Sequence, residues 1–283
     1  MKVVIILIIT SALLYFNSKN PITPEWKIKR NIRYSFIIKN DSKDAIKDVV
    51  FQTYSPLPLN STQKLVNLQS DYEFIKENDI FGNQILSFPI ALIPPYGKKN
   101  ISITAQLVLS KKVAGAKREN KLFLSHQPLI ESNSEKLKKF ALTFKGSNRE
   151  KLKQIYNWEV ETINYSGYGS KDKGALYALK NLEGDCTEFA YLMVAISRAL
   201  GMPARAVNGY IVDHDSKLNT SEFHTWAEVW IDDAWRMIDA QKQVFMENQE
   251  NYLAMNIVTE TSKNKTKFKR FRLSDPNLTI RMK

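Results

Sequence analysis

The sequence predicts an α+β fold in which an all-β sandwich precedes a core of helices packed on an antiparallel sheet. Short β-rich runs separated by turn residues fill the chain between residues 26 and 110. From residue 134 the apolar residues recur with the period of helices, and after residue 204 the pattern returns to that of strands. Helices followed by strands is the order expected of an α+β domain, with the helices on one face of the sheet.

Length and composition fit a folded chain with about two cores. The chain has 283 residues, of which 43% are hydrophobic and 11% aromatic, which is enough to form apolar interiors. We assign residues 25–112 to the β-sandwich, residues 130–259 to the second core, and residues 260–283 to a basic C-terminal strand or tail.

The net charge of +12 is unevenly distributed along the chain. Residues 131–259 hold 15 basic and 18 acidic residues, whereas residues 260–283 hold 8 basic and 2 acidic ones. The basic segments could hold the protein against an anionic envelope surface. We favour the alternative, that a lysine-rich composition merely keeps the protein surface solvated. We find no zinc-ligand spacing, basic recognition helix or RNA-binding motif, so we expect no nucleic-acid partner, no metal and no cofactor.

The N-terminal residues indicate export. Lys2 precedes an apolar run at residues 3–16, and polar residues follow it, which is the pattern of a signal peptide. Fourteen apolar residues are fewer than the roughly 20 that cross a bilayer. No small-residue cleavage site follows, so we expect residues 1–20 to be either a signal peptide or an N-terminal membrane anchor of a periplasmic or cell-envelope protein.

The sandwich is predicted from short runs rich in β-branched and aromatic residues. Several short strands at this spacing favour an antiparallel sandwich, and nothing in it resembles a catalytic set. The runs lie at residues 33–38, 49–54, 84–93 and 101–109, the last of them strictly alternating.

Two helices are predicted before the single cysteine and one begins at it. Residues 134–145 carry apolar residues on one helical face, and Ser147 with Glu150 forms the capping pattern that opens the second helix. The third helix begins at Cys186 and ends before Gly201 and Pro203. Strands are then expected at residues 206–212, 222–230 and 235–240.

Cys186 is the only cysteine of the chain and a candidate nucleophile. Asp185 before it and Glu188 after it form a capping box, which puts the sulfur at the positive end of a helix. That position favours the thiolate over the thiol. The alternative is a small buried hydrophobic residue. Since a lone cysteine cannot pair within an exported chain, we expect the thiol to be retained for its chemistry.

A nucleophilic cysteine needs a base, and the chain has three histidines. His126 and His214 lie in loop-like segments and are expected to be exposed to solvent. His224 opens the strand at residues 224–230, and alternation puts Trp226 on the same face. It is therefore the candidate base.

Asp239 is the candidate partner of His224. If the turn at residues 232–233 has two residues, Trp226 faces Asp239, and His224 is its diagonal neighbour at roughly 7–8 Å. A three-residue turn would place the two side chains on opposite faces of the sheet.

These segments together resemble three sequence blocks of the transglutaminase-like superfamily. The resemblance implies a papain-like core with Cys186 as nucleophile, His224 as general base and Asp239 as the residue that orients the histidine. Thr225 stands where the family usually has alanine. The region at residues 26–110 looks like the sandwich that precedes this core in many exported bacterial members. The three blocks are residues 184–190 with 198–205 and 209–210, residues 224–229, and residues 235–240.

The function we expect is thiol-dependent acyl transfer through a thioester on a protein or peptide amide of the cell envelope. Hydrolysis by a cysteine protease or amidase is favoured over crosslinking, because the chain looks exported and shows no clear calcium site. The alternative is a non-catalytic envelope-binding module on the same scaffold, and a redox-sensing thiol is a weaker one. The Cys186 backbone N–H is one oxyanion donor, and Trp158, Trp226 or a backbone amide is the other, although both tryptophans fit core packing better.

Overall fold

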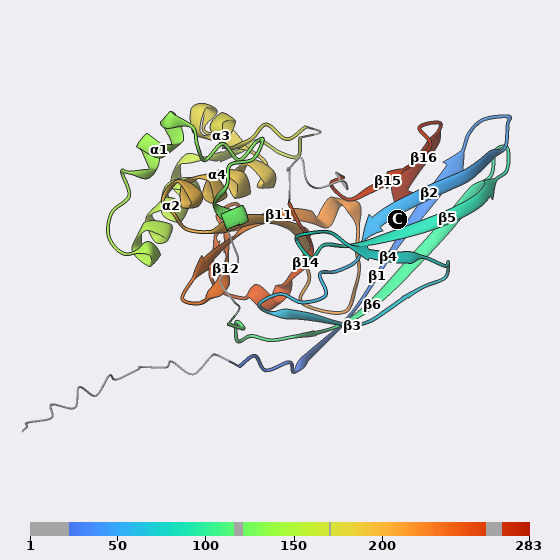
Figure 1. Cartoon of the computed structure of the whole chain (residues 1–283), viewed down its shortest axis with the longest axis horizontal. Coiled ribbons are helices and arrows are strands. Elements are labelled where there is room, and N and C mark those ends of the chain that lie inside the picture. Colours follow the sequence, from blue (N-terminus) through green and yellow to red (C-terminus); the bar gives the residue numbers. More distant parts are fainter. Residues whose placement is uncertain (1–22, 116–120, 170, 259–267) are drawn as a thin grey trace, which may run out of the picture.

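The computed structural model describes residues 23–115, 121–169, 171–258 and 268–283. Within these ranges the predicted α+β fold is confirmed, with long strands in one part of the molecule and helices over a second sheet in the other (Figure 1). The predicted leader at residues 1–20 lies outside the described residues, as do residues 260–267 of the basic C-terminal segment. No helix within the described ranges is both long enough and apolar enough to cross a lipid bilayer.

The N-terminal strands pack their alternating apolar side chains between two sheets. In β1 the buried positions include Ile32, Tyr34 and Phe36, and in β6 they include Ile101 and Ile103. Burying every second side chain is what a strand with one face on a core does. The strands are β1 (Ile28–Asn40), β2 (Ile46–Tyr54), β3 (Gln63–Ser70), β4 (Ile75–Asn78), β5 (Gln84–Ile93) and β6 (Lys98–Leu109).

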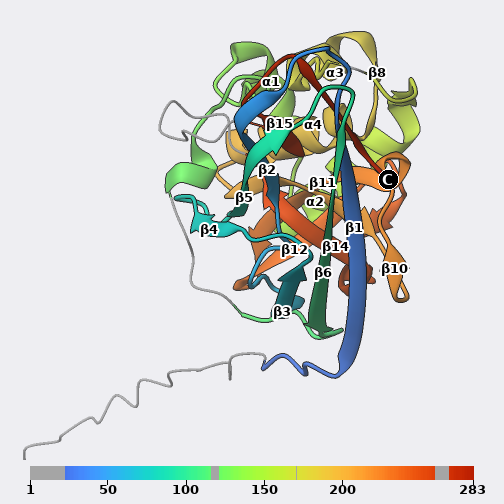
Figure 2. The ribbon, with the colours of Figure 1, turned by 90° about the vertical axis from the view of Figure 1, so that its right-hand side faces the viewer.

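The C-terminus returns to this sandwich and completes both of its sheets. Strand β16 (Leu278–Met282) pairs with β1, and β15 (Phe271–Leu273) pairs with β2. One sheet has the order β10-β1-β6-β3 with β16 also on β1, where β10 is Ser216–Lys217, and the other has the order β15-β2-β5-β4. Figure 2 shows β1 and β6 running along the molecule side by side. The two ends of the described chain therefore meet in one structural unit.

The second part is a sheet of order β13-β12-β11-β9-β14 covered by helices. The helices are α1 (Glu135–Ala141), α2 (Asn148–Thr162), α3 (Ala175–Asn181) and α4 (Cys186–Ala199), with 3₁₀ turns η1 (Lys121–Leu124), η2 (Thr220–Glu222) and η3 (Gln249–Asn251). The strands are β9 (Ala204–Ile211), β11 (Phe223–Ile231), β12 (Ala234–Asp239), β13 (Val244–Phe245) and β14 (Tyr252–Ile257), and a small separate pair is β7 (Asn164–Tyr165) with β8 (Glu183–Gly184).

Several elements differ from the sequence-based prediction. Among the described residues, three α-helices precede the cysteine, not two. The additional helix is α3, which has seven residues and ends on Leu182 in the left-handed conformation, without the usual glycine. Helix α1 ends at Ala141, short of the predicted residue 145. Strands β3, β4 and β14 were not predicted. β3 is half-exposed and largely polar, and β14 is buried on both faces, so neither shows a clear alternation.

Helix α4 is the centre of the second core. Every residue from Cys186 to Arg198 is buried, because β9 and β11 lie against one side of the helix and α1, α2 and α3 against the others (Figure 1). Such all-round burial immobilises the helix that carries Cys186.

Gly209 allows β14 to approach β9 beside the candidate site. It pairs with His224 across the sheet, and a Cβ added to it would lie 2.0 Å from the Leu253 carbonyl oxygen and 2.7 Å from Trp226 Cη2. Neither the backbone nor the packed indole can yield without shifting the strand. This position therefore requires glycine.

We predict that Gly209→Ala lowers the free energy of unfolding by about 1–3 kcal/mol, because overpacking displaces β14. Urea denaturation of the purified protein measures this. Gly115→Ala is the matched control, since its added Cβ would lie 3.7 Å from the nearest atom. Equal effects of the two substitutions would contradict the close approach.

Candidate active site

The N-terminus of α4 is closed by the capping box expected from the sequence. Asp185 Oδ1 accepts a hydrogen bond from the Thr187 N–H at 2.7 Å, and Glu188 Oε2 accepts one from the Asp185 N–H at 3.0 Å. Cys186 is consequently the first residue of the helix and is 9% exposed. Its thiol is not part of a disulfide. The sulfur lies where the helix dipole favours an anion.

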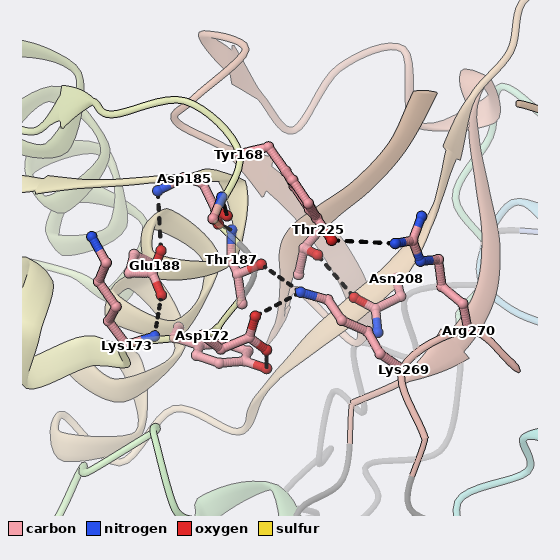
Figure 3. Close-up of polar contacts among 12 residues, drawn as sticks. Tyr168, Asp172, Lys173, Asp185, Thr187, Glu188, Asn208, Thr225, Lys269 and Arg270 are labelled. Carbon is pink, nitrogen blue, oxygen red and sulfur yellow. Dashed lines mark hydrogen bonds and ion pairs between the residues drawn. The ribbon is translucent and has the colours of Figure 1, made fainter. Parts of the chain in front are cut away.

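The same two carboxylates tie the helix to the preceding loop (Figure 3). Glu188 Oε1 accepts hydrogen bonds from the Lys173 N–H at 2.6 Å and the Gly174 N–H at 3.3 Å, and Asp185 Oδ2 accepts one from the Gly169 N–H at 3.0 Å. Both residues therefore cap α4 and hold the loop between β7 and α3.

The turn between β11 and β12 has two residues and brings His224 and Asp239 to one face. Asp232 and Asp233 both have positive φ, at 52° and 56°, and Ile231 pairs with Ala234. Positive φ at both central positions is the geometry of the short hairpin turn that matches strand twist. The pairing continues to Ala227 opposite Ile238, as the two-residue alternative predicts.

His224 and Asp239 form a buried hydrogen bond. The Nε2 atom of His224 lies 2.6 Å from Asp239 Oδ2, and the two residues are 5% and 3% exposed. The Asp239 carboxylate also accepts hydrogen bonds from the Tyr252 hydroxyl at 2.9 Å and from the Lys242 N–H at 3.1 Å. These contacts hold the carboxylate in place, and with Nε2 occupied, Nδ1 is the ring nitrogen left for the thiol. Tyr252 was not found from the sequence because it lies on the unpredicted β14.

The surroundings of His224 favour its charged form. Burial opposes a charge on the ring, but hydrogen bonds to Asp239 and to the Cys186 side chain outweigh it and raise the His224 pKa to about 9. The structure therefore brings the three predicted residues together, with the imidazole in contact with both partners.

These residues open onto a cleft of about 920 Å³. The cleft is large enough for a segment of peptide. Besides Cys186 and His224 it is lined by the aromatic residues Tyr165, Tyr168 and Phe223, the charged residues Glu222, Lys242 and Arg270, and Ile211, Thr220, Ser221 and Gln241.

Residues 138–240 match the family model of the transglutaminase-like superfamily. The chain contains a transglutaminase-like domain. Cys186, His224 and Asp239 all lie within the matched residues, and the resemblance inferred from the three sequence blocks is confirmed.

The relatives of the transglutaminase-like domain are distant. Protein-glutamine gamma-glutamyltransferase 4 of Homo sapiens is 28% identical over a stretch covering 21% of this chain and 13% of that protein, so the chain spans a small part of its length. A candidate cysteine protease from Cytophaga hutchinsonii has 15% identity and a TM-score of 0.58, covering 90% of this chain and 92% of its own. The periplasmic domain of TgpA from Pseudomonas aeruginosa has 12% identity and a TM-score of 0.39, covering 74% and 88%. The Cytophaga structure shows that the fold is shared over most of the chain.

The other histidines and tryptophans singled out from the sequence are not among the residues that line the cleft of the transglutaminase-like domain. His126 and His214 are exposed, as predicted. Trp158 packs on Phe140 at 4.7 Å between ring centroids, and Trp226 is 1% exposed. Neither tryptophan lines the cleft, which agrees with the expected core packing.

Thr225, where the family usually has alanine, has a local explanation in this transglutaminase-like domain. Its hydroxyl donates a hydrogen bond to Asn208 Oδ1 at 2.8 Å, and both residues are buried (Figure 3). The pair satisfies two polar groups inside the sheet.

Glu159 has a buried carboxyl near the His224–Asp239 pair, and no sequence pattern marks this residue. It lies on α2, is fully buried, and neither carboxyl oxygen has a hydrogen-bond partner within the described residues. Burial first, and the charge of Asp239 second, raise its pKa well above the ordinary value. The raised pKa favours the protonated, uncharged carboxyl, which avoids a second negative charge close to Asp239.

We predict that Asp239→Asn lowers the pKa of His224 by about 2 units, because burial of the ring then loses its main compensation. In the wild type this pair contributes stability that is complete below about pH 6.5 and is lost as pH rises through about 9. NMR titration of the imidazoles measures the change, with exposed His126 and His214 as internal references. A His224 that still titrates near pH 9 in the variant would overturn the assignment.

We predict that Glu159→Gln is more stable than the wild type, and that the difference in their free energies of unfolding grows as pH rises. An unfolded Glu ionises near pH 4.5 and the folded Glu159 at a higher pH, so the wild type loses up to about 1.4 kcal/mol of stability per pH unit between those two pKa values. Denaturant unfolding from pH 5 to 8 measures the difference. Glu161→Gln, on the exposed side of the same helix, is the matched control. A pH-independent difference for Glu159→Gln would show that the buried carboxyl ionises normally.

Proposed function

We propose that this protein is a thiol-dependent acyl-transfer enzyme acting on protein or peptide amides. The observation that carries the proposal is the buried His224–Asp239 hydrogen bond beside Cys186, facing a cleft of peptide dimensions. A nucleophile, a base and a group that orients the base are the parts that covalent acyl transfer requires. The family and fold relationships support the same class of chemistry.

In the proposed reaction His224 Nδ1 holds the proton of the Cys186 thiol while Sγ attacks the amide carbonyl carbon. The tetrahedral oxyanion accepts a hydrogen bond from the Cys186 backbone N–H, and the C–N bond breaks as the imidazolium gives its proton to the leaving amine. Water then attacks the thioester, His224 takes its proton, and Sγ leaves. Asp239 keeps the imidazole in one orientation throughout.

We propose hydrolysis as the principal outcome and transfer to an amine as the second. The cleft is lined by several exposed side chains, so bulk water reaches the thioester without a binding site of its own. Substrates in the cell envelope are proposed on the basis of the predicted leader, in which Lys2 precedes an apolar run.

The test compares wild-type protein with Cys186→Ala on a cell-envelope extract, with new peptide termini and isopeptide bonds counted by mass spectrometry. We expect new termini from the wild type and none from Cys186→Ala. Isopeptide bonds formed by the wild type would identify an amine acceptor. Either product formed equally by Cys186→Ala would refute the proposed role of the thiol.

The second arm separates an enzyme from a binding module on the same scaffold. Iodoacetamide should label Cys186 rapidly at neutral pH, and His224→Ala should slow the labelling by about tenfold or more, because the thiol loses its base. His214→Ala, at an exposed site, should leave the rate unchanged. Slow labelling that is indifferent to His224 would favour the non-catalytic alternative.

A further inference from the structure

The basic segment near the C-terminus reaches the cleft that holds Cys186. Lys269 Nζ lies 2.7 Å from Asp172 Oδ1 and 3.2 Å from the Thr187 hydroxyl, in the first turn of α4 (Figure 3). Two residues further on, the chain enters β15 of the sandwich. The ion pair, in which both side chains are at least two-thirds buried, holds the intervening Arg270 at the cleft.

Arg270 is oriented into the cleft by three of its lining residues. Its guanidinium donates hydrogen bonds to the Tyr168 hydroxyl at 3.2 Å and to the Thr220 carbonyl oxygen at 3.4 Å, and it stacks 4.8 Å from the centre of the Phe223 ring. Phe223 directly precedes His224 in β11. The planar group is thus held by stacking and by long hydrogen bonds, which limits its freedom before any ligand binds.

Within the described residues Arg270 forms no ion pair with a carboxylate. Its two hydrogen bonds use two of five N–H donors, so the guanidinium keeps donors for a ligand. Among the described residues that line the cleft, Glu222 is the one with a carboxylate, and it accepts a hydrogen bond from the Asn219 N–H at 3.1 Å. Arg270 and Lys242 therefore outnumber Glu222 in the cleft.

The excess of positive charge among the residues that line the cleft is opposite in sign to the net charge of residues 131–259. Residues 131–259 have more acidic than basic residues, so the domain alone would repel an anionic substrate. Arg270 comes from the strongly basic segment that follows. A planar guanidinium with unused donors fits a carboxylate better than it fits a neutral amide.

We propose that Arg270 binds a carboxylate of the acyl donor, so that the preferred substrates are peptides with an acidic side chain or a terminal carboxylate close to the reacting amide. This inference rests on the proposed acyl-transfer function and names its substrate class. Arg270 acts here as a specificity residue, and the chemistry at Cys186 does not depend on it.

The test uses chloroacetyl tripeptide amides, which alkylate Cys186 with loss of chloride, carrying Glu or Gln at each of three positions. A further pair ends in a free or an amidated carboxyl group, which separates a side chain from a terminus as the source of the carboxylate. We expect at least one carboxylate probe to label wild-type protein about tenfold faster than its neutral counterpart, equivalent to about 1.4 kcal/mol. In Arg270→Gln that ratio should fall to about one.

Two further variants keep the test decisive. Arg272→Gln, in the same segment but stacked on Phe268 and hydrogen-bonded to Gln52, should retain the wild-type ratio. If Arg270→Gln fails to fold, Arg270→Lys should keep only part of the preference, because a point charge lacks the fork geometry. A wild-type ratio near one for every pair, or an unchanged ratio in the Arg270 variants, would overturn the proposal.

A binding measurement distinguishes failure of the proposed carboxylate site at Arg270 from failure of the proposed acyl-transfer function. Fluorescent acetyl tripeptides of the same sequences can be titrated into Cys186→Ala by anisotropy, which needs no thiol reactivity. An unreactive Cys186 with a carboxylate preference that disappears on adding Arg270→Gln would refute acyl transfer and retain the anion site. Normal reactivity with no carboxylate preference in either assay would refute the anion site alone.

Discussion

The register between β11 and β12 is the constraint on which the candidate site depends. Side chains alternate along a strand, so a slip of one residue would turn Asp239 to the opposite face from His224. The two-residue turn at Asp232 and Asp233 prevents that slip. Gly209 then lets β14 approach, and Tyr252 on that strand reaches the same carboxylate. The buried His224–Asp239 pair thus depends on the backbone geometry of the turn at Asp232 and Asp233 and of Gly209.

Helix α4 packs on this sheet in one orientation because its N-terminus and its length are both held by the surrounding residues. Its capping carboxylates bind the preceding loop as well as the helix N-terminus, and its length is buried on all sides. Cys186 therefore has little freedom relative to His224, although the two residues come from different layers of the domain. Holding reacting groups in place before the substrate arrives is a large part of what covalent catalysis requires.

The parts of the site that the sequence predicted are those determined by local chemistry. The capping box at Asp185 and Glu188 is a pattern four residues long, and the structure confirms it. For the hairpin at Asp232 and Asp233 the sequence left a two-residue and a three-residue turn open, and the structure has the two-residue turn. The rest depends on pairing between distant segments. β14 shows no alternation because both of its faces are buried, and α3 is too short to establish a helical period.

Arg270 shows most clearly why such residues escape a sequence-based analysis. Nothing in residues 268–273 marks them as part of a site, and their charge reads as a solvated basic tail. They reach the cleft that holds Cys186 only because β15 and β16 return to the N-terminal sandwich, which draws the preceding segment across the first turn of α4. The strands that complete the sandwich sheets thereby position Arg270 in the cleft of the transglutaminase-like domain. The sandwich is then more than a support for that domain, because the strand pairing that completes it also changes the charge of the cleft.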